Sequence, residues 1–321
     1  MSIVEKALHK AQQAARAGSA AEPGSTEAGT MEPATRSPPV PDPVTTPIAR
    51  HPARGSDDSS LTSRDLKQIL HFDTARLAAD GRLPSADMAR QTEDEIRRIK
   101  WPLLKAIAGH EGAAPTRNNV ILVTSAVPNE GKTFMSLNLA LSIVRDREMR
   151  VILVDGDVAR PGLTPTLGLE GRPGLNDVLD DASLDVSEVT YRTDVEGLFF
   201  IPAGKWHEHS PEFFAGSRMP QMFEALSRRV GNGVIILDSP PLLATNEAQA
   251  ATRFVGQVLL VVRADDTEQQ AVQDAIALVD KSTPINAVLN RVQASAMSRY
   301  YGQYYYGYGY GRGQRPGKGN A

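Results

Sequence analysis

The sequence of 321 residues contains no cysteine, which excludes disulfide bonds, thiolate metal ligands and thiol catalysis. It has no apolar run approaching the roughly 20 residues that a membrane-spanning helix needs. The N-terminal segment MSIVEKALHKAQQAARAG also lacks the apolar core of a signal peptide. The net charge of −3 argues against nucleic acid as a general partner. These absences favour a cytosolic protein that depends on apolar packing.

Aromatic residues are scarce, at 6%, and tyrosine is concentrated in one place. Seven of the eight tyrosines lie in the stretch RYYGQYYYGYGYGRG, residues 299–313, and only Tyr191 lies elsewhere. Tyrosine normally buries its ring while its hydroxyl finds a partner, but the interleaved glycines resist packing into a fixed element. We therefore expect a mobile, exposed row of phenols.

Composition divides the chain into five parts. Residues 18–60 are rich in Pro, Ser, Thr, Ala and Gly. They have few side chains that could form a core, which is typical of a disordered linker. The expected parts are an amphipathic helix at 1–17, the linker at 18–60, a helical region at 61–117, a compact domain at 118–292 and a Tyr/Gly-rich flexible tail at 293–321.

The compact domain alternates short apolar runs with helical segments. Near-continuous apolar strands between helices predict an α/β fold, with a mostly parallel sheet covered by helices on both faces. We expect strands at 119–125, 150–155, 197–203, 233–238, 256–262 and 286–292, and helices at 132–146, 211–229, 244–252 and 267–281. Ligands of such sheets bind at the carboxyl ends of the strands, so the informative loops follow Ser125, Val154 and Leu237.

The loop after the first of these strands reads AVPNEGKTF, residues 126–134, and fits a relaxed phosphate-loop pattern. Backbone amides of such a loop and of the next helix can bind phosphate oxygens. Lys132 can then reach the terminal phosphates, and the Thr133 hydroxyl can bind Mg²⁺. A Gly-Lys-Thr triplet alone also occurs in surface turns that cap helices, but the strand–loop–helix context favours nucleotide binding. The expected nucleotide-binding residues are Pro128, Asn129, Glu130, Gly131, Lys132, Thr133 and Phe134.

Three aspartates end two other predicted strands. Asp155 and Asp157 follow the run VILV, and Asp238 follows VIIL. A single aspartate at a strand end is usually a cap or a loop residue, but three at one edge, with Thr133, form a hard-oxygen cluster suited to Mg²⁺. One carboxylate can also accept the proton of an attacking hydroxyl. Asp155 is our first candidate for that base, and Asp155 and Asp157 can exchange the metal and base roles.

The stretches AVPNEGKT, VILVDGDVARP and VIILDSPP together resemble the Walker A, Walker A′ and Walker B motifs of bacterial tyrosine kinases, which are P-loop proteins related to the ParA/MinD ATPases. MSIVEKAL, IRRIKWPLL and the tyrosine-rich tail extend the resemblance to the exosortase-associated tyrosine autokinases of exopolysaccharide operons.

This resemblance implies a P-loop NTPase fold and an autokinase that uses ATP and Mg²⁺ and regulates exopolysaccharide polymerisation and export. It implies catalytic roles for Lys132, Asp155, Asp157 and Asp238, and an adenine contact for Asn290. The implied phosphate acceptors, on an adjacent subunit, are Tyr300, Tyr301, Tyr304, Tyr305, Tyr306, Tyr308 and Tyr310.

The sequence departs from the patterns of both related families. Asn129 stands where the kinases usually have glycine, and asparagine tolerates a left-handed backbone better than most residues. Ala159 occupies the arginine position of the Walker A′ pattern, with Arg160 one residue late. Val127 replaces the extra lysine of ParA/MinD proteins. This counts against the alternative, a ParA/MinD-like regulatory ATPase without kinase activity. A second alternative is a non-catalytic adaptor with a vestigial nucleotide site. We rank it last, because the loop and acidic residues that catalysis requires are all present.

Asp94, Arg97 and Lys100 align with the Glu-x-x-Arg-x-x-Arg oligomerisation helix of the kinases, which implies ring-like self-association. A solvated charged helix is the alternative. The resemblance further implies a separate inner-membrane polysaccharide co-polymerase as activator, a cognate tyrosine phosphatase, and recruitment to the inner face of the plasma membrane. His207 and His209 have a spacing found in metal sites, but a pair in a loop is more often solvated.

Overall fold

The central sheet is built from the apolar runs that the sequence marks as strands. The computed structural model describes residues 69–109, 117–146 and 149–292, so the expected N-terminal helix, linker and tail lie outside the described residues. Within them, eight strands form one sheet in the order β1-β4-β5-β3-β6-β2-β7-β8. Their bounds are β1 (Ile69–Leu70), β2 (Val120–Ser125), β3 (Val151–Asp155), β4 (Tyr191–Thr193), β5 (Leu198–Ile201), β6 (Val234–Asp238), β7 (Gln257–Arg263) and β8 (Ile285–Asn290).

All neighbouring strands are parallel except β4 and β5, which are antiparallel. The mostly parallel α/β fold is therefore confirmed, and the six predicted strands coincide with β2, β3, β5, β6, β7 and β8. The short strands β1 and β4 were not predicted, because two or three residues give no readable alternation.

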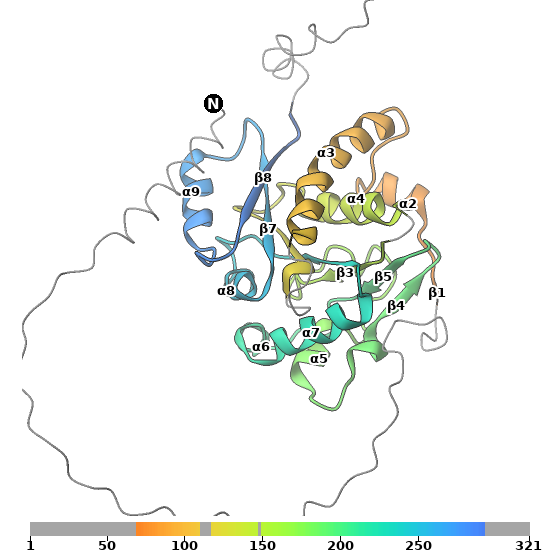
Figure 1. Cartoon of the computed structure of the whole chain (residues 1–321), viewed down its shortest axis with the longest axis vertical. Coiled ribbons are helices and arrows are strands. Elements are labelled where there is room, and N and C mark those ends of the chain that lie inside the picture. The colour runs from red at the N-terminus through yellow and green to blue at the C-terminus, as the bar shows by residue number, and fades with distance from the viewer. Residues whose placement is uncertain (1–68, 110–116, 147–148, 293–321) are drawn as a thin grey trace, which may run out of the picture.

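Helices cover both faces of the sheet (Figure 1). On one face lie α2 (Thr74–Ala79), α3 (Ala89–Ala108) and α4 (Lys132–Val144). The other face carries α5 (Leu175–Asp180), α6 (Ser210–Ala215), α7 (Arg218–Val230), α8 (Asn246–Ala251) and α9 (Gln269–Ala277). Among the described residues, short 3-10 helices connect elements at Arg117–Asn119, Val186–Val189 and Thr252–Phe254.

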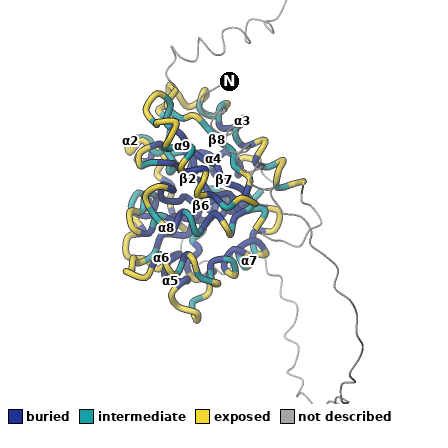
Figure 2. Tube along the Cα trace, turned by 90° about the vertical axis from the view of Figure 1, so that its left-hand side faces the viewer, coloured by how far each residue is buried: buried dark blue, intermediate teal, exposed yellow. Residues whose placement is uncertain are grey.

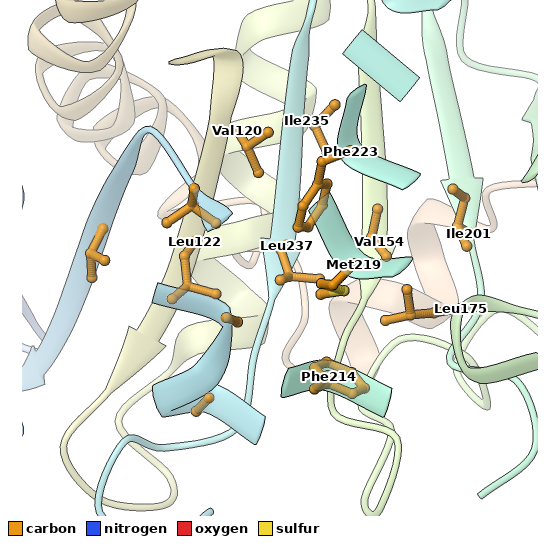
Figure 3. Packing of buried hydrophobic residues seen from close by; sticks show 14 of the residues in the cluster. Val120, Leu122, Val154, Leu175, Ile201, Phe214, Met219, Phe223, Ile235 and Leu237 are labelled. Atoms are coloured by element: carbon orange, nitrogen blue, oxygen red, sulfur yellow. The ribbon is translucent and has the colours of Figure 1, made fainter. Parts of the chain in front are cut away.

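Alternate residues of each strand supply the two cores. Ile121 and Val123 point to the α4 side, whereas Val120 and Leu122 point to the α7 side. Figure 3 shows the core on the α7 side, in which Phe223 of α7 packs beside the strands. Figure 2 shows strands β2, β6 and β7 buried inside the helical layers. Because both faces are covered, polar groups of the inner strands become accessible only at their ends.

Two expectations about the helices need correction. The single helix expected at 211–229 is two helices, because Gly216 ends α6 before α7 begins at Arg218. Residues 69–109, expected to belong to a separate helical region, share the sheet and the core of the main domain. β1 pairs with β4, and Leu77, Ile96 and Leu103 are buried in the core on the α4 side.

Candidate functional site

The phosphate loop connects β2 to α4 and has two residues with positive φ. Asn129 has φ 66° and Gly131 has φ 96°. The expectation that Asn129 supports a left-handed backbone is therefore confirmed. No side chain caps the first amides of α4, which leaves these N–H groups available to an anion, and the dipole of the helix adds to the attraction.

The Glu130 side chain points into the protein. It is only 1% exposed. One carboxylate oxygen accepts from the Val127 amide at 2.8 Å, and the other accepts from the Arg263 amide at 3.1 Å and from the Thr267 hydroxyl. The loop is thereby tied to the connection between β7 and α9. Glu130 was expected among the nucleotide-binding residues; its carboxylate fixes the loop, and a phosphate contact through its backbone amide stays a prediction.

Asn290, at the end of β8, lies against the same loop. Its Nδ2 donates to the Glu130 carbonyl at 2.8 Å, and a Cβ added to Gly131 would fall 2.0 Å from that nitrogen. Glycine is therefore required at position 131 by its backbone angle and by this close approach. The expected adenine residue thus contacts the phosphate loop and marks its β8 flank.

Asp155 and Asp238 are cross-strand neighbours at the carboxyl ends of β3 and β6. The Ser136 hydroxyl, one helical turn beyond Lys132, donates to Asp238 at 2.9 Å, and the Thr133 side chain lies beside the same carboxylate. Burial raises the pKa of Asp238 to about 7, and the neighbouring Asp155 adds to that rise. Ser136 was not among the predicted site residues. Its place on the predicted helix, one turn after Lys132, is the signal that puts its hydroxyl on the same face as the lysine.

Asp155 is completely buried. Its Oδ2 accepts from the Leu163 amide at 3.0 Å and from the amide and hydroxyl of Thr164 at 2.7 and 2.8 Å. Its Oδ1 is buried with no protein partner among the described residues. Burial raises the pKa of Asp155. This carboxylate is closed to a bulky phenol in the present conformation, whereas its orphaned oxygen is a suitable hard ligand for a cation.

Asp157 is more accessible than Asp155. Its Oδ1 accepts from the Arg160 amide at 3.0 Å, and burial raises its pKa to about 6. Burial lowers the pKa of Lys132, although Asp238 and Asp157 oppose that effect by favouring its charged form. The lysine and the acids are thus close enough for their charges to interact across the start of α4. Ala159 and Arg160 are exposed beside them.

A loop from β3 passes close to Thr133. A Cβ added to Gly162 would lie 2.9 Å from the Thr133 hydroxyl. That hydroxyl can donate to Asp238 and still present a lone pair to a cation. Thr133, Asp238 and the free oxygen of Asp155 therefore fit Mg²⁺ when phosphate oxygens and water complete its shell. Within the described ranges, no three His, Cys, Asp or Glu side chains form a metal-binding group without such additions, and this includes His207 and His209.

The predicted oligomerisation residues do not share one environment. Arg97 is exposed and pairs with Glu93 and Asp94 of its own helix. Lys100 is buried, and its Nζ donates to the Ser142 carbonyl at 3.0 Å and to Asp146 at 2.9 Å. Lys100 thus fastens α3 to the end of α4 within one chain, which leaves Asp94 and Arg97 at the surface. The seven tail tyrosines lie outside the described residues.

Known proteins resemble this chain in sequence and in fold. The tyrosine-protein kinase ptk of Acinetobacter johnsonii is 28% identical over 189 residues, 58% of this chain and 25% of that protein. The tyrosine-protein kinase wzc of Salmonella typhimurium is 26% identical over 249 residues, 76% of this chain and 32% of that protein. The kinase domain of Escherichia coli tyrosine kinase ETK superposes with a TM-score of 0.54 at 25% identity, covering 73% of this chain and 87% of that domain.

In sequence and fold, this chain is similar to bacterial tyrosine kinases. It spans only a quarter to a third of the length of the two curated relatives, so the sequence match concerns one part of each. No protein-family model matches the chain. None of the helices in the described ranges has the length and apolar character to cross a membrane.

Proposed function

We propose that this chain is a protein-tyrosine autokinase that transfers the γ-phosphate of ATP to its own C-terminal tyrosines. One observation carries the proposal: the uncapped start of α4 adjoins a partly buried lysine, Lys132, and the three acids Asp155, Asp157 and Asp238 in a chain similar to tyrosine kinases. The seven tyrosines of residues 299–313 are a ready set of acceptors.

The proposed roles follow from charge and access. Lys132 and the amides of residues 128–134 bind the β- and γ-phosphates, because they combine a cation with free N–H donors. Thr133 and Asp238 hold Mg²⁺, and the free oxygen of Asp155 helps to fix it. When bound, Mg²⁺ supplies neutralisation of phosphate charge. Asn290 borders the space for the adenine of ATP.

Asp157 is the proposed proton acceptor for the attacking phenol. A phenol has a pKa near roughly 10 and needs help to attack at neutral pH. Asp157, with its pKa raised to about 6, is mostly ionised at neutral pH and yet more basic than an ordinary aspartate. Asp155 is fully buried and accepts three hydrogen bonds, which favours Asp157 over Asp155 in this role.

The proposal extends to partners and place. As in the kinases that the chain resembles, the acceptor tail belongs to an adjacent subunit, in a ring to which Asp94 and Arg97 contribute. A separate inner-membrane polysaccharide co-polymerase recruits the chain to the cytoplasmic face of the membrane and activates it, and a tyrosine phosphatase reverses the reaction. The process regulated is exopolysaccharide polymerisation and export.

Mass spectrometry after incubation with ATP and Mg²⁺ tests this function, with the wild-type chain beside Lys132→Met. We expect phosphate on tyrosines of residues 299–313 in the wild type and none in the variant. If neither carries phosphate, the measurement is repeated with a co-polymerase's cytosolic segment added. Continued release of free phosphate without phosphotyrosine would overturn the kinase proposal and indicate a ParA/MinD-like ATPase.

A further inference from the structure

An exposed tryptophan stands on a loop at the carboxyl edge of the sheet, and nothing in the proposed chemistry uses it. Trp206 is 57% exposed and belongs to the β5–α6 loop, residues 202–209. Tryptophan is among the residues that most often anchor a partner in protein interfaces.

The backbone on both sides of Trp206 is held in place. The Lys205 amide donates to Asp177 at 3.1 Å, and the Lys205 carbonyl accepts from Asn176 at 2.6 Å. The His207 amide donates to the Ser210 hydroxyl at 3.0 Å. The indole is therefore presented from a fixed loop, which lowers the entropy lost when a ligand binds to it.

The same loop is hydrogen-bonded to the acidic cluster. The Ala203 amide donates to the Thr164 hydroxyl at 2.9 Å, and this hydroxyl donates to Asp155 at 2.8 Å. A single threonine therefore bridges the buried acid and the root of the loop that carries Trp206.

The strand order places this loop on the side from which an acceptor would approach. Asn290 marks the β8 flank of the phosphate loop, whereas β3 and β5 lie on the opposite flank, beyond β6. With the adenine of ATP near Asn290, the terminal phosphate points toward β3 and β5. An in-line nucleophile then arrives from that side. Strands are about 4.8 Å apart, so β5 ends roughly 10 Å from β6. A peptide entering there passes Trp206.

We propose that the β5–α6 loop is the docking site for the tyrosine-rich segment 299–313 of a second copy, with Trp206 stacking against one of its tyrosines. This inference rests on the proposed kinase function. The interleaved glycines allow the segment's backbone to lie close to the loop while neighbouring tyrosines reach the indole and the terminal phosphate.

Chain length favours delivery by a second copy. The described residues end at Val292, just past β8, and five strand spacings separate β8 from β5, about 24 Å. Tyr300 lies eight residues further on, a reach of at most about 28 Å in a straight line. To dock on its own loop, this tyrosine would need a fully extended path across the bound nucleotide. Tyr310, 18 residues past Val292, has a reach of about 63 Å. Chain length therefore selects a second copy for the first tyrosines of the segment, whereas a second copy can present any of the seven.

A two-protein assay tests the docking site with full-length chains. The acceptor is Lys132→Met, which supplies the tail, and the donor has its seven tail tyrosines replaced by alanine. Trp206→Ala in the donor should raise the KM for the acceptor by roughly three- to tenfold, the size expected for one aromatic pair, and change kcat much less. Trp206→Phe in the donor should restore most of the lost affinity.

Two controls assign the effect to the docking site. Trp206→Ala in the acceptor should leave the KM unchanged, because the acceptor contributes only its tail. Leu278→Ala in the donor removes another exposed apolar side chain, 38% exposed at the end of α9, and should also leave it unchanged. An unchanged KM for Trp206→Ala donors, with transfer intact, would overturn the docking site alone. Absence of transfer from the reference donor, with a co-polymerase's cytosolic segment present, would overturn the kinase proposal and this inference with it.

Discussion

Glu130 offers a sharp test of how the phosphate loop is held. Its buried carboxylate accepts from two backbone amides, those of Val127 and Arg263, and from the Thr267 hydroxyl. Glu130→Ala removes the acceptor and leaves both amides unpaired, whereas the hydroxyl can rotate. An unsatisfied buried donor costs about 1–3 kcal/mol, so two donors cost about 2–6 kcal/mol of unfolding free energy.

Urea unfolding followed by circular dichroism measures this loss. Glu130→Gln keeps the shape and one acceptor oxygen but turns an amide N–H₂ toward a backbone donor, so we expect about half the loss seen with alanine. ATP affinity should fall in the same order, because a loosened loop must be ordered when the phosphates bind.

Glu170→Ala is the matched control, since Glu170 is exposed and its removal should change the unfolding free energy by less than about 0.5 kcal/mol. The reasoning would be refuted if Glu130→Ala unfolded with the same free energy as the control. It would also be refuted if the loss appeared while ATP affinity stayed at the wild-type value.

Two further variants test buried charged groups, Asp238 in the site and Lys100 between α3 and the end of α4. The pKa of Asp238, raised to about 7, exceeds the roughly 3.9 of an unfolded aspartate. The folded protein therefore binds more protons than the unfolded chain between those values, and its stability falls as pH rises through that window. Asp238→Asn should reduce this fall in metal-free protein, as measured by urea unfolding at pH 5 and pH 8; an unchanged difference between the two pH values would contradict the assignment. Lys100→Met keeps the packing but loses the bonds to Ser142 and Asp146, so it should lower the unfolding free energy by about 1–3 kcal/mol; an equal loss from the exposed Arg97→Met would argue against the buried contact.

The sequence predicts most of this fold because its strands are short, apolar and separated by helices. The phosphate loop was predicted for a similar reason: a strand, a glycine and a helix start are all local features. Asn129 is the clearest case, because the tolerance of asparagine for a left-handed backbone matches its φ of 66°. Short elements were missed where the local signal is weak, as in the antiparallel strand β4, Tyr191–Thr193.

Side-chain environments that depend on distant partners could not be predicted. Glu130 has the same charge and spacing whether it faces a nucleotide or the protein interior, and its partner Arg263 lies 133 residues away. Lys100 reads as one residue of a charged helical face, yet its amine bonds to the end of α4. The sequence therefore identifies which chemical group stands at a motif position. The direction in which that side chain points depends on how distant elements pack around it.

The same distinction bears on the choice between the two aspartates of the Walker A′ stretch. The sequence makes Asp155 the first candidate for the base and leaves an exchange of roles with Asp157 open, since both follow the same strand. The fold separates them: the β3 strand end and Thr164 enclose Asp155, while Asp157 stays partly accessible. A base must exchange its proton with a substrate, whereas a group that orients a cation works better when other contacts hold it still. The burial of Asp155 therefore suits a fixed ligand, and the accessibility of Asp157 suits a group that meets the phenol.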